Sequence, residues 1–323
     1  MRIVQFQLGP QPPSELIEEI RAFDDVELVP ANDAAGLAAA LAGAEILVVN
    51  NRSYSADIAR IIRDQGTAVR WIQFTTSGID NGRLHGFPSG VTVTNAAGLR
   101  AFAVAEHAIM LMLALVRRVR ETEAARAAAM WIRDDITPGM ENLAGMHLVI
   151  VGLGSIGQDI ARKAKAFDMT VTGISRSSDA IPNVDTILPR ERLEAACAGA
   201  DIVVVATTHD AAADKIMSRA AIEAMKPTAF LVNIARGSLV DQDALVEALQ
   251  AGRIAGAGLD VVATEPLPDG DPLWSMANVV LTPHVGGAGG SGRGGGVAAI
   301  FAENLRRWKC GEPLTKIVIA KTG

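Results

Sequence analysis

Between Leu148 and His284 the chain repeats one pattern, in which a short apolar run is followed by a stretch of helical character. The apolar runs are LVIVG, TVTGI, DIVVVAT, AFLVNIA, AGAGLDVV and NVVLTPH. They are continuous rather than alternating, as in strands that are buried on both faces. Strands of this kind belong to a parallel sheet covered by helices, so this part of the chain predicts an α/β fold.

The residues before 100 follow the same alternation with shorter runs, separated by helix-like segments such as SELIEEIRAF. These runs are Arg2 to Gln7, Val26 to Val29, Ile46 to Asn50, Val69 to Phe74 and Val91 to Thr94. A chain of 323 residues suits two domains, so we expect two doubly wound parallel-sheet units. An apolar helix from about Leu99 to Arg118 makes the first crossing between them, and a helix from Ala298 to Trp308 follows the return crossing.

Charge and composition exclude several classes of partner. The formal net charge of −6 and the scattered basic residues argue against nucleic acid and anionic membrane surfaces. The most apolar stretch, Ala101 to Val116, contains Glu106 and His107 and is shorter than the ~20 residues that span a bilayer, so we expect a buried helix. Cys197 and Cys310 form no disulfide or zinc pattern, and the N-terminus reads as a strand without a signal peptide. We therefore predict no metal site and a cytoplasmic protein.

The sharpest local signal is GLGSIG at residues 152–157, directly after the run HLVIV and directly before the helix-like QDIARKAKAF. In this position the first glycine permits a tight turn, the second lets backbone amides approach a pyrophosphate, and the third lets the helix pack on the strand. The helix N-terminus adds N–H groups and a positive dipole end. We predict dinucleotide binding, against the alternative of a glycine-rich turn without a ligand. The binding residues would be Gly152, Gly154, Ser155, Ile156 and Gly157.

The end of the next predicted strand is where a cofactor's adenosine ribose is expected, and NAD sites usually carry Asp or Glu there. This chain has Ser175, Arg176 and Ser177 instead. Without a carboxylate to repel it, a 2′-phosphate can be held by the guanidinium and two hydroxyls through charge-assisted hydrogen bonds. We predict a preference for NADP(H), with NAD(H) as the other cofactor.

Polar residues also stand at the ends of later predicted strands. Taken alone, each of these residues is also compatible with a purely structural role, such as a surface arginine or a glutamate at the end of a loop. They are Arg236 in VNIARGSLVD, Asp260 and Glu265 in AGLDVVATEPLP, and His284 in VVLTPHVGG. Together with TTSGIDN, NAAG followed by VAEHA, and NLRRWKCGEPL, they resemble the D-isomer specific 2-hydroxyacid dehydrogenase family over nearly the whole chain. Within that family the chain is most similar in character to NADP-preferring glyoxylate/hydroxypyruvate reductases.

The resemblance implies a flavodoxin-like substrate domain from residues 1–98 and 289–323, and an inserted Rossmann-type domain from residues 99–288. A ligand cleft is expected between them, and Arg52 and Tyr54 are candidates to line it. The glycine-rich residues 286–296 would form either a helix start or a hinge.

The resemblance also implies hydride transfer between a nicotinamide and C2 of a small 2-keto or D-2-hydroxy acid. Reduction of a keto acid requires a cation near its carboxylate and carbonyl, and a proton donor to the carbonyl oxygen. Arg236 matches the family's cation and His284 its acid and base. Glu265 matches the carboxylate that favours a protonated imidazole. Asp260 matches the family residue on the nicotinamide side of the cofactor.

Further contacts follow from the same resemblance. The family binds the substrate carboxylate through backbone amides, which correspond to Ser77 and Gly78 here. Ala235 and Thr207 correspond to cofactor contacts, although this chain has Thr207, Thr208 and His209 in the segment where the family usually has a proline. His107 in the apolar crossing helix is assigned a structural or interface role.

Glyoxylate and hydroxypyruvate are the substrates that the resemblance suggests, in the direction of keto-acid reduction. A homodimer built on the crossing segment, which contains Trp131, is also implied. Two alternatives stay open: an enzyme similar to phosphoglycerate dehydrogenase, and a non-catalytic cofactor-sensing interaction protein on the same fold.

Overall fold

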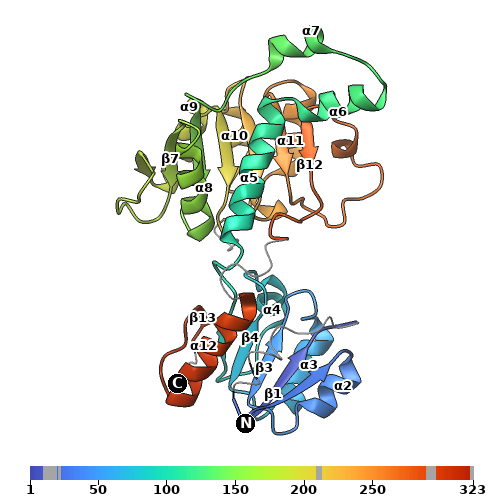
Figure 1. The fold of residues 1–323 in the computed structure, drawn as a ribbon, viewed down its shortest axis with the longest axis vertical. Coiled ribbons are helices and arrows are strands. Elements are labelled where there is room, and N and C mark those ends of the chain that lie inside the picture. Colours follow the sequence, from blue (N-terminus) through green and yellow to red (C-terminus); the bar gives the residue numbers. More distant parts are fainter. Residues whose placement is uncertain (10–19, 21–22, 209–212, 289–295, 321–323) are drawn as a thin grey trace. The chain divides into compact units, whose positions relative to one another are not determined.

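The computed structural model describes residues 1–9, 20, 23–208, 213–288 and 296–320. The chain divides into two compact units, one formed by Met1–Arg100 with Gly290–Gly323 and the other by Ala101–Gly289. Figure 1 shows both units, coloured along the sequence. The helix predicted at residues 14–23 and the glycine-rich segment 286–296 lie largely outside the described residues.

The first unit is built on one sheet with the strand order β13-β5-β4-β3-β1-β2. Strands β1 to β5 are parallel, in the order of a flavodoxin-like fold, whereas β13 joins β5 in the antiparallel direction. The strands are β1 (Arg2–Phe6), β2 (Glu27–Ala31), β3 (Ile46–Val49), β4 (Trp71–Phe74), β5 (Thr92–Thr94) and β13 (Ile317–Ile319). The helices are α2 (Ala34–Ala40), α3 (Ala56–Gln65), α4 (Asp80–His85) and α12 (Gly296–Cys310).

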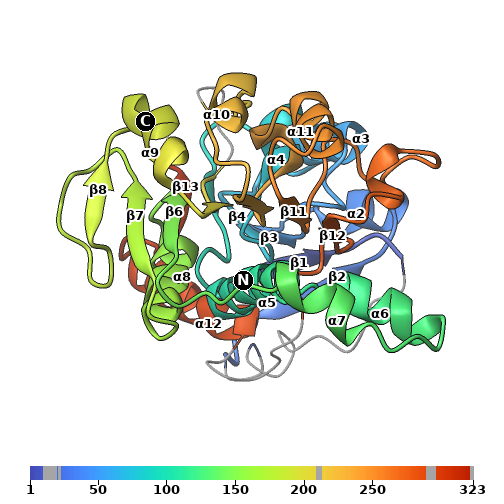
Figure 2. The same ribbon diagram turned by 90° about the horizontal axis from the view of Figure 1, so that it is seen from above.

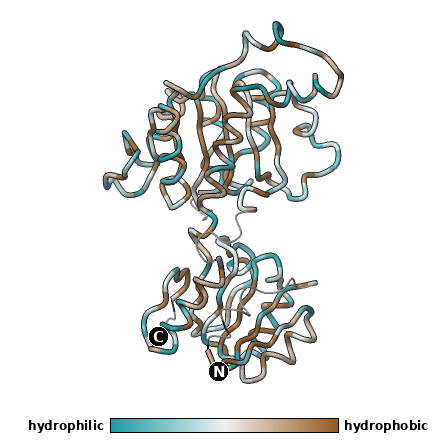
Figure 3. The backbone as a smooth tube through the Cα atoms, viewed as in Figure 1, coloured by the Kyte–Doolittle hydropathy of each residue, from teal (hydrophilic) through white to brown (hydrophobic). Residues whose placement is uncertain are grey.

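Both faces of this sheet are covered. Val4 and Phe6 belong to the core that includes α2 and α3, whereas Ile3, the residue before Val4, belongs to the opposite core with Trp71 and Phe301 of α12. The Trp71 and Phe301 rings stack with their centroids 5.2 Å apart. Because alternate side chains of a strand point to opposite faces, a strand covered on both faces needs apolar residues throughout. This explains the continuous runs, which Figure 3 shows as hydrophobic strands inside each unit.

The second unit holds a sheet with the strand order β12-β11-β10-β9-β6-β7-β8, in which all the pairings are parallel. The first strand of this unit, β6, lies between β7 and β9, so the direction of winding reverses there, as in a Rossmann-type fold. The strands are β6 (His147–Val151), β7 (Thr170–Ile174), β8 (Thr186–Leu188), β9 (Ile202–Val205), β10 (Phe230–Asn233), β11 (Gly256–Leu259) and β12 (Val279–Leu281). The predicted α/β class with two doubly wound sheets is confirmed.

Helices cover both faces of the second sheet, as Figure 2 shows from above. Leu148 and Ile150 of β6 lie in the core that includes α5 and α8, and Val149 and Val151 lie in the core that includes α9 to α11. The helices are α5 (Ala101–Val116), α8 (Ser155–Lys165), α9 (Leu193–Gly199), α10 (Arg219–Glu223) and α11 (Gln242–Gln250). The short 3-10 turns are η2 (Arg190–Arg192), η3 (Gly237–Leu239) and η4 (Pro272–Trp274).

After α5 the chain forms an arm, residues 119–139, which Figure 1 shows leaving the helix layer of the second unit. It contains α6 (Val119–Ala127), α7 (Arg133–Ile136) and the 3-10 turn η1 (Thr137–Gly139). The guanidinium Nε of Arg118 donates to the Gly139 carbonyl at 2.9 Å and so joins the two ends of the arm. Trp131 within the arm is 92% exposed. None of the helices in the described residues combines the length and the apolar composition that a membrane span requires.

Candidate active site

The glycine fingerprint forms the turn between β6 and α8, as the sequence predicts. Gly152 has a φ of 102°, and a Cβ atom there would lie 2.7 Å from the Thr207 Cα. A Cβ atom on Gly157 would lie 2.0 Å from the Gly152 carbonyl oxygen. Neither position therefore accepts a side chain, and Gly152 brings the end of β6 directly against Thr207 after β9.

The N-terminus of α8 is open for an anion. Gly154 is its N-cap, no side chain caps it, and a Cβ atom on Gly154 would meet nothing within 4 Å. Within the described residues, no acceptor takes the amide N–H of Ser155, Ile156 or Gly157. Orphan N–H groups at the positive end of a helix bind phosphate, so this turn fits the pyrophosphate of a dinucleotide.

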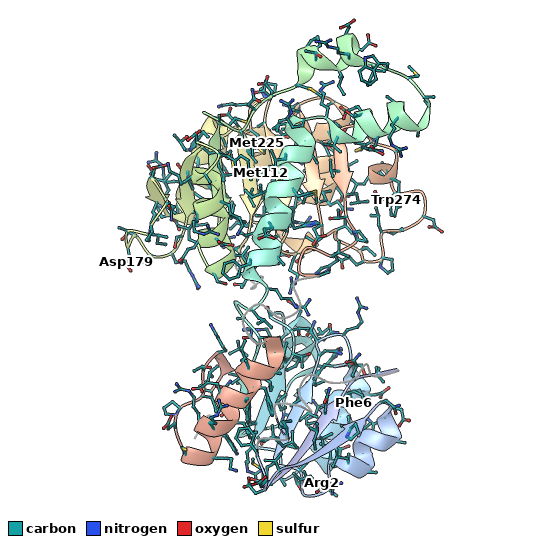
Figure 4. The ribbon with its side chains drawn as sticks, in the orientation of Figure 1. Arg2, Phe6, Met112, Asp179, Met225 and Trp274 are labelled. Carbon is teal, nitrogen blue, oxygen red and sulfur yellow. The ribbon has the colours of Figure 1, made fainter. Side chains whose placement is uncertain are left out.

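The predicted ribose-binding residues begin directly after β7. The Ser177 amide donates to the Ser175 hydroxyl at 3.3 Å, and Arg176 between them is exposed. The Ser177 hydroxyl donates to the Asp179 carboxylate at 2.6 Å. Figure 4 labels Asp179 at the outer end of this loop. The strand-end residues alone do not point to Asp179, although SRSSD places this carboxylate in the same polar run.

Arg236 follows β10 in a loop that a buried amide shapes. The Asn233 side chain, 1% exposed, donates from Nδ2 to the Arg236 carbonyl at 2.8 Å and accepts the Ala235 amide N–H at 3.1 Å. A Cβ atom on Gly237 would lie only 1.9 Å from the Val262 carbonyl oxygen. Glycine is therefore required at 237, because the Arg236 loop packs directly on the loop after β11.

His284 and Glu265 form the hydrogen bond that the resemblance implied. The distance between His284 Nδ1 and Glu265 Oε2 is 2.7 Å. The second carboxylate oxygen, Oε1, accepts the Val262 amide at 3.3 Å. The two side chains are 47% and 38% exposed, so the pair is accessible from solvent. His284 has a φ of 55°, a left-handed conformation that a non-glycine residue rarely adopts.

Asp260 anchors the turn that carries His284. Its side chain is 3% exposed, and its Oδ1 accepts the Thr282 hydroxyl at 2.7 Å and the Val285 amide at 2.9 Å. Its Oδ2 accepts the Gly286 amide at 2.8 Å. The Asp260 carbonyl accepts the His284 amide at 2.8 Å. Hydrogen bonds on both sides of His284 thus hold its unusual backbone conformation.

His107 of α5, for which the sequence predicts a structural or interface role, completes this cluster. Its Nε2 lies 2.8 Å from the Thr282 hydroxyl oxygen and 3.3 Å from Asp260 Oδ1. The sequence signal for this residue was its position in VAEHA, within an otherwise apolar helix.

The predicted substrate loop of the first unit follows β4. The Ser77 carbonyl accepts the Asn95 amide group at 2.6 Å, and the Gly78 carbonyl accepts the Thr76 hydroxyl at 2.8 Å. Among the described residues, no acceptor takes the amide N–H of Ser77 or Gly78. The loop is therefore held by its carbonyl oxygens and presents two unused donors.

Tyr54 corrects one expectation. Its side chain is 0% exposed, it packs on the Phe74 and Phe87 rings, and its hydroxyl donates to the Gly86 carbonyl at 2.9 Å. Burial raises the pKa of this phenol. Tyr54 is a core residue, because its ring completes an aromatic cluster, and it does not line a ligand site.

The sequence profile of the NAD binding domain of D-isomer specific 2-hydroxyacid dehydrogenases matches residues 109–286. The match covers more than half of the 323 residues and lies within the second unit. The chain belongs to this family.

Two relatives illustrate the similarity. The glyoxylate reductase of Thermococcus gammatolerans is 39% identical over 230 residues, which are 69% of this chain and 68% of the relative. The D-3-phosphoglycerate dehydrogenase of Methanocaldococcus jannaschii is 31% identical over 287 residues, 85% of this chain and 52% of that protein. The D-2-hydroxyacid dehydrogenase is thus an oxidoreductase that binds a nicotinamide cofactor and acts on small hydroxy or keto acids.

A solved structure agrees over the full length. The NADPH-dependent glyoxylate/hydroxypyruvate reductase of Sinorhizobium meliloti, in complex with citrate, superposes with a TM-score of 0.81 at 28% identity. The alignment covers 99% of this chain and 98% of the other. The predicted family, fold class and enzyme class of this dehydrogenase are confirmed.

Proposed function

We propose that this dehydrogenase is an NADP(H)-preferring reductase of small 2-keto acids in which His284 is the general acid and base. The observation that carries the proposal is the 2.7 Å hydrogen bond between His284 Nδ1 and Glu265 Oε2. The Glu265 carboxylate accepts the Nδ1–H, which orients the ring and leaves Nε2 to donate a proton to the substrate's carbonyl oxygen. In the oxidative direction Nε2 accepts that proton.

Residues 99–288, which nearly coincide with the second unit, serve as the dinucleotide-binding domain. The orphan amides of Ser155, Ile156 and Gly157 would hold the pyrophosphate, and Gly152 and Gly154 leave the space for it. Further contacts are assigned to Thr207, Ala235 and Asp260. When bound, the cofactor supplies or accepts the hydride at its nicotinamide ring.

The substrate is held by charge and by backbone donors. The Arg236 guanidinium attracts the carboxylate and polarises the carbonyl of a 2-keto acid. The amides of Ser77 and Gly78, in the substrate domain of residues 1–98 and 289–323, donate to the same carboxylate. Their carbonyl oxygens are already bonded, which keeps both N–H groups in a fixed direction.

NADP(H) is the preferred cofactor because Arg176 and Ser175 offer donors to a 2′-phosphate, with no carboxylate directly at the strand end. The Ser177 hydroxyl is engaged by Asp179, and this carboxylate lessens the preference. NAD(H) is therefore the second cofactor, used with a lower kcat/KM. The similar Sinorhizobium meliloti enzyme is NADPH-dependent, which supports this order.

Glyoxylate and hydroxypyruvate are the proposed substrates, since relatives are glyoxylate reductases.

The proposed assembly is a homodimer through the arm, residues 119–139, whose Trp131 is 92% exposed. The proposed location is the reducing cytoplasm, where Cys197 and Cys310 stay thiols.

A substrate panel tests the proposal. Oxidation of NADPH and NADH is followed by absorbance with glyoxylate, hydroxypyruvate and 3-phosphohydroxypyruvate. We expect steady turnover of the first two with a higher kcat/KM for NADPH. Turnover of 3-phosphohydroxypyruvate alone would favour the phosphoglycerate dehydrogenase alternative. This alternative is included because the chain is similar to a D-3-phosphoglycerate dehydrogenase over 85% of its length. Tight cofactor binding without turnover of a wider keto-acid panel would indicate a sensor.

A further inference from the structure

We propose that His107 is a positioning residue that sets the location of the His284 imidazole through Thr282 and Asp260. The inference rests on the proposed role of His284, and it adds a residue of helix α5 to that function. Within the part of the chain that the structure describes, His107 bonds to Thr282 and Asp260 and not to His284 or Glu265. It therefore acts on the turn that carries His284.

The hydrogen bonds fix which His107 nitrogen carries a proton. The Thr282 hydroxyl has one hydrogen and donates it to Asp260 Oδ1 at 2.7 Å. The 2.8 Å contact between His107 Nε2 and the same hydroxyl oxygen therefore requires Nε2–H to be the donor. Asp260 Oδ1 lies 3.3 Å from that nitrogen and faces the same donor. His107 thus supports both partners at once.

The position of His107 follows from close packing of α5 on the sheet. A Cβ atom on Gly258 of β11 would lie 3.1 Å from the Leu111 Cβ, so the helix approaches this strand through a glycine. His107 precedes Leu111 by one helical turn and lies on the same face. Asp260 follows Gly258 by two residues and lies on the same side of the strand. One glycine therefore lets the ring reach the carboxylate.

A second glycine closes the cluster. A Cβ atom on Gly286 would lie 2.7 Å from Asp260 Oδ2 and 3.2 Å from His107 Cδ2. Gly286 is buried between these two side chains, while His284, two residues earlier, remains exposed. The buried end of the turn is thus held in place by these contacts, and they determine the position of the exposed His284 ring. Loss of the His107 N–H donor weakens these contacts and displaces His284, the proposed proton donor.

His147 offers a matched control. Its Nε2 contacts the Thr172 hydroxyl at 2.9 Å, the same kind of His–Thr pair, and its Nδ1 contacts the Gly199 carbonyl at 3.0 Å. It stands at the first residue of β6, whereas ligands of such sheets bind at the carboxyl ends of the strands. Its replacement tests the loss of a comparable hydrogen bond away from the site.

The experiment compares His107→Leu, His107→Gln and His147→Leu in the full-length enzyme with glyoxylate. We expect His107→Leu to lower kcat on the order of tenfold to a hundredfold, as for a misplaced catalytic group. The Kd for reduced cofactor, measured by fluorescence, should change by less than about threefold. This change is smaller than the tenfold rise in Kd that a loss of about 1.4 kcal/mol of binding free energy would cause. His107→Gln keeps a donor near Nε2 and should restore most of kcat. His147→Leu should lower Tm and leave kcat unchanged.

Several outcomes would overturn the inference: a normal kcat in His107→Leu, equal losses in the Leu and Gln variants, or a kcat loss in His147→Leu of the same size. If His107→Leu does not fold, Thr282→Val removes the relaying hydroxyl and must give the same loss of kcat with cofactor binding retained. His284→Asn separates the two proposals. Normal turnover in that variant ends the proposed function, whereas an inactive His284→Asn beside a normal His107→Leu ends this inference alone.

Discussion

Asp260 holds His284 on both sides: its carbonyl oxygen accepts the His284 amide at 2.8 Å, and its carboxylate accepts the amides of Val285 and Gly286. A histidine with a φ of 55° is strained by itself, and these bonds compensate for the strain. The Asp260 side chain is only 3% exposed, so its carboxylate depends on these hydrogen-bond donors to offset the loss of hydration. His284, the proposed proton donor, is thus placed by its backbone as well as by Glu265.

His284→Asn should lower kcat by about 10² to 10⁴, the usual contribution of a general acid. Glu265→Gln should lower it less, because the amide still accepts a hydrogen bond from Nδ1. Steady-state reduction of glyoxylate measures both, and a near-normal rate for His284→Asn would reject the acid role.

Ser175→Asp should shift preference from NADPH toward NADH. A carboxylate at the strand end repels a 2′-phosphate and accepts the ribose hydroxyl, so the ratio of kcat/KM values should change by about tenfold or more. Asp179→Asn should shift the ratio the other way, since it removes the negative charge bonded to Ser177. An unchanged ratio in both variants would contradict the assignment of this loop.

Gly157→Ala and Gly154→Ala should separate folding from binding. A Cβ atom on Gly157 lies 2.0 Å from a backbone oxygen, so this variant should lose about 1–3 kcal/mol of unfolding free energy. Gly154 has open space and an ordinary φ of −71°, so Gly154→Ala should keep its Tm and bind cofactor more weakly. Denaturant unfolding and cofactor titration measure the two effects; equal Tm values in both variants would argue against the packing account.

Asp185 links stability to acid pH. Hydrogen bonds from the Lys165 ammonium and the Val171 amide hold the pKa of Asp185 below 3.8, its ordinary value. Because the folded pKa is lowered, the stabilisation is complete above the unfolded pKa and is lost as pH falls through the folded pKa. Asp185→Asn should therefore cost about 1 kcal/mol near neutral pH, a small value because the pair is exposed.

This difference between wild type and Asp185→Asn should shrink when urea unfolding is repeated at pH values below 3.8. Asp57→Asn on α3 is the control, because that carboxylate is 82% exposed and lies 3.5 Å from Arg60. A constant difference at every pH would speak against the proposed linkage.

Trp131→Ala should weaken the proposed homodimer. A buried interface tryptophan commonly contributes about 2 kcal/mol or more, which corresponds to a rise in the dissociation constant above about tenfold. Trp274→Ala is the control, since this side chain is also exposed, at 54%, but lies outside the arm. Sedimentation over a concentration series measures the assembly, and a monomeric wild type would refute the dimer.

The sequence by itself determined the parts of this protein that depend on neighbouring residues. Strands such as β6 and β9 were predictable because burial on both faces demands continuous apolar runs. The turn between β6 and α8 was predictable because the three glycines of GLGSIG directly follow a strand and lead into a helix start. The pairing of Glu265 with His284 was reached only through the family resemblance.

Tertiary structure decided what depends on distant residues. His107 and Asp260 meet because α5 packs on β11 through Gly258, and no local pattern reports that approach. The edge strand β13 is a short run that becomes a strand by pairing with β5. Tyr54 follows a strand end yet is buried, because Phe74 and Phe87 enclose its ring. Packing between remote segments, rather than residue type, settled each of these positions.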